Sequence, residues 1–149
     1  MNDTKKSLST LHELIETCED GRKGYQDASE HIENEELKTV LYRLSQQRAL
    51  FEAELKDEIR HLGGSTEEDS SVAGTAHRVW LNIKSTLRGN DTDAILNECK
   101  RGDKAAIERY EAALKAELPD FIREKVADQF KLIKGAYNQL VEFQEHPES

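Results

Sequence analysis

Apolar residues recur along most of this chain at alternating steps of three and four residues, the spacing that places side chains on one face of a helix. In residues 8–32 this stripe comprises Leu8, Leu11, Ile15, Cys18, Tyr25 and Ile32. Comparable stripes follow in residues 35–62, 92–117 and 120–145. The pattern predicts four amphipathic helices of matched length, each about 40 Å long at ~1.5 Å per residue.

Residues with capping and helix-breaking preferences mark the ends of these helices. Thr10 and Glu13 have the spacing of a capping box near the start of the first helix. Gly63 and Gly64 form a stop signal after the second helix. Pro119 separates the third helix from the fourth, in whose first turn a proline is well tolerated. Because both turns are short, the first two helices and the last two are predicted to form antiparallel hairpins.

The connection between the hairpins, residues 63–91, is much longer than either turn and has its own short amphipathic pattern in residues 76–87. A segment of this length can return along a whole bundle. It contains Trp80, which must cover either its own bundle or a second subunit. We therefore predict an all-α fold with a single domain over residues 1–149, a ferritin-like four-helix bundle of two antiparallel hairpins joined by a long crossover.

A short internal echo relates the two hairpins. Residues 15–23 align with residues 96–104 at a constant offset of 81, and Cys18, Gly21 and Lys23 match Cys99, Gly102 and Lys104. This echo favours a pseudo-two-fold relation between the hairpins. The two cysteines lie on apolar helix positions without a CxxC or zinc spacing, so we expect them to be small, reduced core residues.

Composition narrows the range of partners. The formal net charge is −9, with 21 basic and 30 acidic residues, and no basic stripe is available to neutralise phosphates. We therefore expect neither nucleic acid nor anionic membrane as a partner. No stretch approaches the ~20 consecutive apolar residues of a membrane span, and the N-terminus lacks the apolar core of a signal peptide. We expect an acidic, cytoplasmic protein.

The chain resembles a bacterial group of ferritin-like four-helix-bundle proteins that is classed as a domain of unknown function. The resemblance spans nearly the whole chain and is carried by residues 20–25, residues 53–55, residues 71–74 together with Trp80, and residues 95–110. It implies the fold. It implies no established activity, so no catalytic residue is assigned.

Ferritin-like di-iron proteins place carboxylates and Glu-x-x-His pairs at mid-bundle, where they converge on two metals. Only Glu58 with His61 has this spacing here, and the pair lies in the last turn of its helix. The nearest counterpart, Glu142 with His146, lies at the C-terminal end of the fourth helix. In the predicted topology these two ends are about 40 Å apart, so they cannot share a metal pair.

The predicted centre of the bundle is polar and contains arginine. Extending each apolar stripe through the middle of its helix places Arg22, Arg48, Asp103 and Gln129 there. Because arginine stays protonated, two guanidinium groups would repel divalent metals. We expect a structural polar layer in which Arg22 or Arg48 pairs with Asp103 and with Glu54, an arrangement that fixes helix register more than it stabilises.

A displaced metal site is the alternative. In the predicted topology one end of the bundle brings together His12, Glu58, His61 and Glu117. Such a set could bind one Zn²⁺ or Fe²⁺ ion, although residues of this kind at helix ends are more often solvated. No cofactor is otherwise expected.

Two functions therefore follow from the sequence. The first is a non-enzymatic bundle that associates with itself or with a protein partner, in the stress-related setting that the ferritin-like resemblance implies. The alternative is a metal-binding redox or storage protein of the ferritin-like class, holding iron or zinc. No complete catalytic constellation is present in the sequence.

Overall fold

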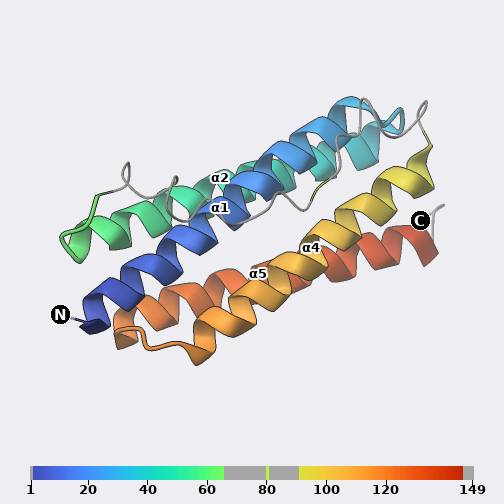
Figure 1. The fold of residues 1–149 in the computed structure, drawn as a ribbon. Helices are drawn as coiled ribbons and strands as arrows, with labels where there is room; N and C mark the ends of the chain where they lie inside the picture. Colours follow the sequence, from blue (N-terminus) through green and yellow to red (C-terminus); the bar gives the residue numbers. More distant parts are fainter. Residues whose placement is uncertain (1, 66–79, 81–90, 146–149) are drawn as a thin grey trace.

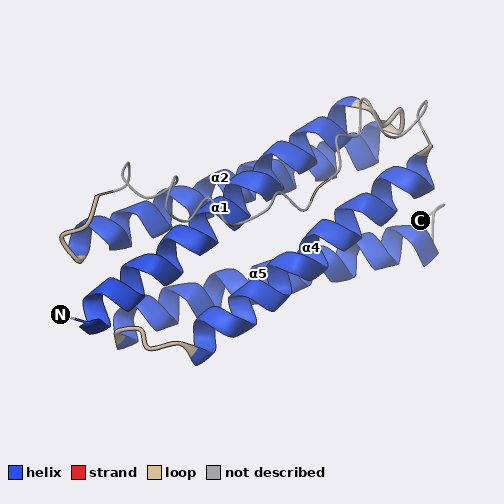
Figure 2. Cartoon of the chain, viewed as in Figure 1, coloured by secondary structure: helices blue, strands red, loops and turns tan. Residues whose placement is uncertain are grey.

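The computed structural model describes residues 2–65, 80 and 91–145 (Figure 1). These residues form four long helices: α1 (Asn2–Glu30), α2 (Glu35–His61), α4 (Thr92–Lys115) and α5 (Asp120–Glu145). No strand occurs in this part of the chain (Figure 2), which confirms the all-α fold class. None of the helices described is long and apolar enough to cross a membrane.

The helix ends follow local capping chemistry. The Asn34 side chain accepts a hydrogen bond from the Leu37 amide at 2.9 Å at the start of α2. The Asp91 carboxylate accepts one from the Ala94 amide at 3.1 Å at the start of α4. After α2, Gly63 takes a φ of +80°, a left-handed conformation that ends a helix at little cost only for glycine.

The predicted start of the first helix was wrong. We expected residue 8, with Thr10 and Glu13 as a capping box, but α1 begins at Asn2 and both residues lie inside it. Tertiary contacts account for the added turns, because the Ser7 hydroxyl donates to the Glu117 carbonyl at 3.2 Å. Packing of this kind stabilises a helix beyond what its sequence propensity predicts.

The helices form two antiparallel pairs, α1 with α2 and α4 with α5 (Figure 1). The pairs are joined laterally by contacts of α1 with α4 and of α2 with α5. Because α2 and α4 run in the same direction, the end of α2 and the start of α4 lie at opposite ends of the molecule. The predicted short helix at residues 76–87 and most of the predicted crossover, residues 63–91, lie outside the described residues.

Trp80 is buried between the two pairs on the α1–α4 side. A Cβ atom added at Gly24 of α1 would lie 2.2 Å from the indole ring, and one added at Gly102 of α4 would lie 2.3 Å from it. The indole also meets the Tyr25 ring edge-on, with ring centroids 5.0 Å apart. Trp80 therefore covers its own bundle, and the two glycines create the slot that receives it.

The helix ends of the two hairpins correspond at an offset of 85 residues. The interval is 115 − 30 = 85 for the ends of α1 and α4, and 120 − 35 = 85 for the starts of α2 and α5. At this offset Tyr25 in the first hairpin is equivalent in position to Tyr110 in the second, and Cys18 is equivalent to Asp103. The hydrogen bonds follow the same equivalence: the Tyr25 hydroxyl is hydrogen-bonded to Asp103, and the equivalent Tyr110 hydroxyl is hydrogen-bonded to Cys18. The offset of 81 read from the sequence differs from this register by about one helical turn.

Candidate functional site

The centre of the bundle holds a buried ion pair between α2 and α4. Arg48 Nη1 lies 2.8 Å from Asp103 Oδ1, and the two side chains are 1% and 0% exposed. The Tyr25 hydroxyl of α1 donates to the other oxygen of the same carboxylate. Three helices therefore converge on Asp103.

The arginine is held by more than its carboxylate partner. Its guanidinium carbon lies 5.2 Å from the centroid of the Tyr25 ring, a cation–π distance, and its Nε donates to Gln47 at 3.1 Å. A Cβ atom at Gly21 would lie 3.2 Å from Arg48 Nη1, so this glycine makes room for the guanidinium. Nη2 is buried and finds no hydrogen-bond partner among the described residues.

The charge of this cluster is fixed by its surroundings. Burial by itself would lower the pKa of Arg48, but the nearby charge of Asp103 raises that pKa above its usual range. Burial and the same carboxylate raise the pKa of Tyr25 well above the usual value. At neutral pH the guanidinium is charged and the phenol is protonated, so the guanidinium charge is held beside Asp103 in a site of low polarity.

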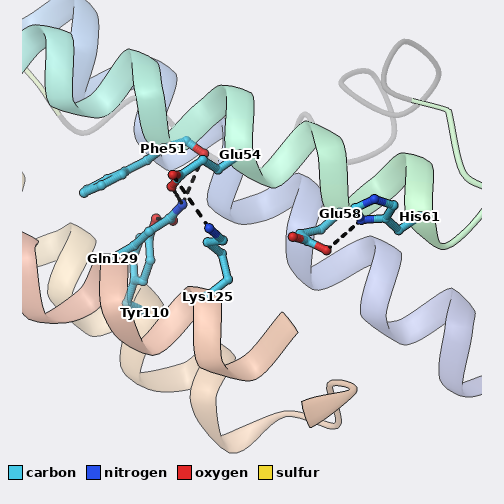
Figure 3. Close-up of polar contacts among 7 residues, drawn as sticks. All are labelled: Phe51, Glu54, Glu58, His61, Tyr110, Lys125 and Gln129. Atoms are coloured by element: carbon cyan, nitrogen blue, oxygen red, sulfur yellow. Dashed lines mark hydrogen bonds and ion pairs between the residues drawn. The ribbon is translucent and has the colours of Figure 1, made fainter. Parts of the chain in front are cut away.

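A second hydrogen-bond network crosses the bundle through Gln129 of α5 (Figure 3). The Tyr110 hydroxyl of α4 donates to Gln129 Oε1 at 2.7 Å and lies 3.1 Å from the Cys18 sulfur of α1. Gln129 Nε2 donates to Glu54 Oε1 of α2 at 2.9 Å, and Glu54 also meets Lys125 at 3.7 Å. This network links all four helices and reaches the surface at the lysine.

The predicted polar-layer residues thus occupy two networks and one surface pair. Arg48 and Asp103 form the ion pair, whereas Glu54 and Gln129 belong to the second network. Arg22 does not reach Asp103; its Nε lies 3.4 Å from Glu52 on the partly exposed α1–α2 side. The sequence left open which arginine pairs with Asp103, because both lie on stripes that pass through the centre.

A family model described as "Domain of unknown function (DUF2383)" matches residues 6–116. The chain belongs to this family. A comparison with curated proteins finds no significant match. The matched region of this DUF2383 protein includes Tyr25, Arg48, Trp80 and Asp103, but it ends before Gln129.

The four candidate metal ligands do not assemble in the DUF2383 protein. Figure 3 shows His61 beside Glu58 in the last turn of α2, and His61 Nδ1 lies 3.1 Å from Glu58 Oε1. The helices and loops described contain no group of three or more His, Cys, Asp or Glu residues able to hold a metal ion. His12 is buried on α1, whereas Glu117 is exposed after α4. Glu117 shares a pocket of about 400 Å³ with Arg123, a cation that opposes metal binding there.

Sequence reasoning missed the polar roles of the two buried tyrosines. Tyr25 is part of the apolar stripe of the first helix and Tyr110 is equally buried, yet each hydroxyl is hydrogen-bonded at the centre. A buried tyrosine hydroxyl usually has a partner. The sequence did contain a signal for these partners, because Asp103 and Gln129 are polar residues at mid-helix positions on the apolar stripes of the third and fourth helices.

The two cysteines of this DUF2383 protein are expected to be unreactive in the native state. Burial raises the pKa of Cys18 to about 11 and the pKa of Cys99 well above its usual value. Since the thiolate is the reactive species, a thiol reagent such as DTNB should label neither residue until the protein unfolds. The check is the labelling rate in native buffer and in denaturant. Rapid labelling of the native protein would contradict the burial of both thiols.

The same shift predicts how stability depends on pH. The unfolded Cys18 thiol loses its proton near pH 9.0, whereas the folded thiol holds it to about 11. Between these values the unfolded state binds fewer protons, so stability falls as pH rises. Chemical denaturation from pH 8 to 11 measures the loss, and Cys18→Ala should reduce its slope. An unchanged slope in the variant would contradict this assignment.

Proposed function

We propose that this DUF2383 protein is a ferritin-like bundle of the bacterial cytoplasm that acts by association, with itself or with a protein partner, and not by catalysis. The directions of the helices support the ferritin-like connectivity, because α2 and α4 run in parallel and their joined ends lie at opposite ends of the bundle. A stress-related setting is the one that the ferritin-like resemblance implies.

One observation carries the proposal: an ion pair fills the centre of the bundle, while large apolar side chains are exposed on its surface. The centre, where a ferritin-like metal pair would need carboxylates and imidazoles, holds Arg48 bound to Asp103. Leu50 of α2 and Leu132 of α5 are 57% and 53% exposed. Tyr42 and Phe121 are also more than half exposed, and large exposed apolar side chains of this kind favour contact with another macromolecule.

The metal-binding alternative finds no support in the geometry of these residues. A dinuclear site needs several carboxylates around the ions, and Asp103 is already bound by Arg48 and Tyr25. A cation entering the centre would meet the fixed charge of the guanidinium. His12, Glu58, His61 and Glu117 offer no alternative cluster.

The experiment is sedimentation equilibrium of the untagged chain over a wide concentration range, combined with metal analysis of the same sample. The proposal predicts a mass that rises above the 17.0 kDa of one chain and no bound iron or zinc. A strict monomer at every concentration would overturn self-association. Stoichiometric metal in the purified protein would favour the alternative.

A further inference from the structure

A pocket of about 400 Å³ lies at the end of the bundle that holds the start of α1 and the α4–α5 turn (Figure 1). Residues of α1, of this turn and of α5 line it, together with Leu62, which follows α2. Ligand pockets range over ~300–1,000 Å³, so this one suits a small molecule. Leu50 and Leu132 do not line it, so binding here is independent of the proposed association.

Two opposite charges line this pocket without pairing. The last turn of α4 holds the Arg123 guanidinium, whose Nη1 donates to the Leu114 carbonyl and whose Nη2 donates to the Ala116 carbonyl at 2.8 Å. The Glu117 side chain is exposed and makes neither a hydrogen bond nor an ion pair with the residues that the structure describes. Because neutral carbonyls and not Glu117 bind the guanidinium, one cation and one carboxylate stay available in the same pocket.

A buried hydroxyl adds an acceptor near Glu117. Ser7 is 2% exposed, and its hydroxyl donates to the main-chain carbonyl of Glu117 at 3.2 Å. A serine hydroxyl has one proton, so this hydrogen bond leaves Ser7 Oγ with only lone pairs to offer the pocket. An acceptor of this kind, together with a carboxylate, suits an ammonium group, which has three N–H donors and no acceptor.

The other lining residues provide a second hydroxyl and an apolar wall. Thr4 lies one turn before Ser7 on the same face of α1, and its side chain makes no hydrogen bond within the described part of the chain. Its hydroxyl is therefore able to donate to a ligand, as the guanidinium is. Leu62, Leu118 and Pro119 provide apolar surface, which suits a short hydrocarbon chain.

We infer that this pocket binds a free α-amino acid with a small apolar side chain, such as leucine. The Glu117 carboxylate and Ser7 Oγ accept hydrogen bonds from its ammonium group, Arg123 and Thr4 donate to its carboxylate, and the apolar wall contacts its side chain. A purely anionic ligand would be repelled by Glu117, and a purely cationic one by Arg123. A ligand that carries both charges satisfies both residues.

Titration of the full-length chain with L-leucine, followed by the amide signals in NMR spectra, tests this inference. L-leucine at up to about 10 mM should give saturable shifts at Ser7, Leu118 and Arg123. 4-Methylpentanoate lacks the ammonium group of leucine, and leucinamide lacks its carboxylate. Each should bind at least about tenfold more weakly, because one polar group of the pocket is then left without its partner.

Two substitutions locate the binding groups. Glu117→Gln changes an exposed residue, so the chain should stay folded while the affinity for L-leucine falls at least about tenfold. Thr4→Val keeps the side-chain shape and should weaken binding severalfold through the lost hydroxyl. Glu124→Gln is the matched control, since Glu124 is equally exposed on α5 but does not line the pocket, and it should leave the affinity unchanged.

Three results would overturn the inference. The first is the absence of saturable shifts with L-leucine, and the second is equal binding of L-leucine, 4-methylpentanoate and leucinamide. The third is an unchanged affinity in Glu117→Gln, which would place the binding site elsewhere. Circular dichroism of each variant checks that the four helices are retained, and the outcome has no bearing on the sedimentation experiment above.

Discussion

Replacing Asp103 with alanine is expected to lower the free energy of unfolding by about 3–5 kcal/mol. The substitution leaves the Arg48 guanidinium buried at 1% exposure without a counter-charge, and it also removes the acceptor of the Tyr25 hydroxyl. An uncompensated charge in the interior is far more costly than the loss of an average hydrogen bond. Urea denaturation of the wild type and of the variant measures the difference.

Removing both charges together provides the control. In Arg48→Met/Asp103→Leu the ion pair is replaced by apolar side chains of similar size, and we expect most of the loss in the single variant to disappear. This result would show that the pair contributes specificity more than stability. A double variant as unstable as Asp103→Ala would instead show that the pair itself holds the helices together.

Substituting Gly24 with alanine is expected to lower the free energy of unfolding and to displace Trp80. The new methyl group would lie 2.2 Å from the Trp80 ring, so the indole must move out of the slot between α1 and α4. Overpacking of this kind costs roughly 1–3 kcal/mol, and the displaced indole loses its burial as well. Trp80 is the single tryptophan of the chain, so its fluorescence should shift to longer wavelength in the folded variant.

The control for this experiment lies one residue away. Lys23→Ala changes an exposed position of the same helix and adds no atom near the indole, so both the emission and the stability should stay close to those of the wild type. Gly102→Ala approaches the ring from α4 and should reproduce the effect of Gly24→Ala. An unshifted emission maximum in both glycine variants would contradict the placement of Trp80.

The helical segments were predictable because their information is local. Apolar spacing, the Gly63 stop and Pro119 mark three of the four helices to within two residues. The start of α1 was not predictable in this way, since it depends on the contact of Ser7 with Glu117, 110 residues away in sequence. Local patterns contain no information on such contacts.

The polar centre was predictable in composition but not in pairing. Helical spacing alone places Arg22, Arg48, Asp103 and Gln129 near the middle of their helices. Which of them meet depends on rotation of each helix about its axis by a few tens of degrees, which directs Arg22 to Glu52 and leaves Asp103 to Arg48. Spacing in one helix does not determine its rotation against the next.

The slot for Trp80 was missed for a related reason. Gly24 and Gly102 are 78 residues apart and appear in the sequence as isolated glycines inside helices. Each would be expected to weaken its helix. Their purpose emerges only when α1 and α4 face each other across the indole.

The reciprocal contacts of Tyr25 and Tyr110 have a consequence for the origin of the fold. A homodimer of one helical hairpin would place the same tyrosine of each copy against the same position of the other copy. Joining the two copies into one chain would turn these symmetric contacts into Tyr25–Asp103 and Tyr110–Cys18. This is the arrangement that duplication and fusion of a two-helix ancestor would leave. In the present chain only the second hairpin carries a carboxylate at this level, and that carboxylate binds Arg48.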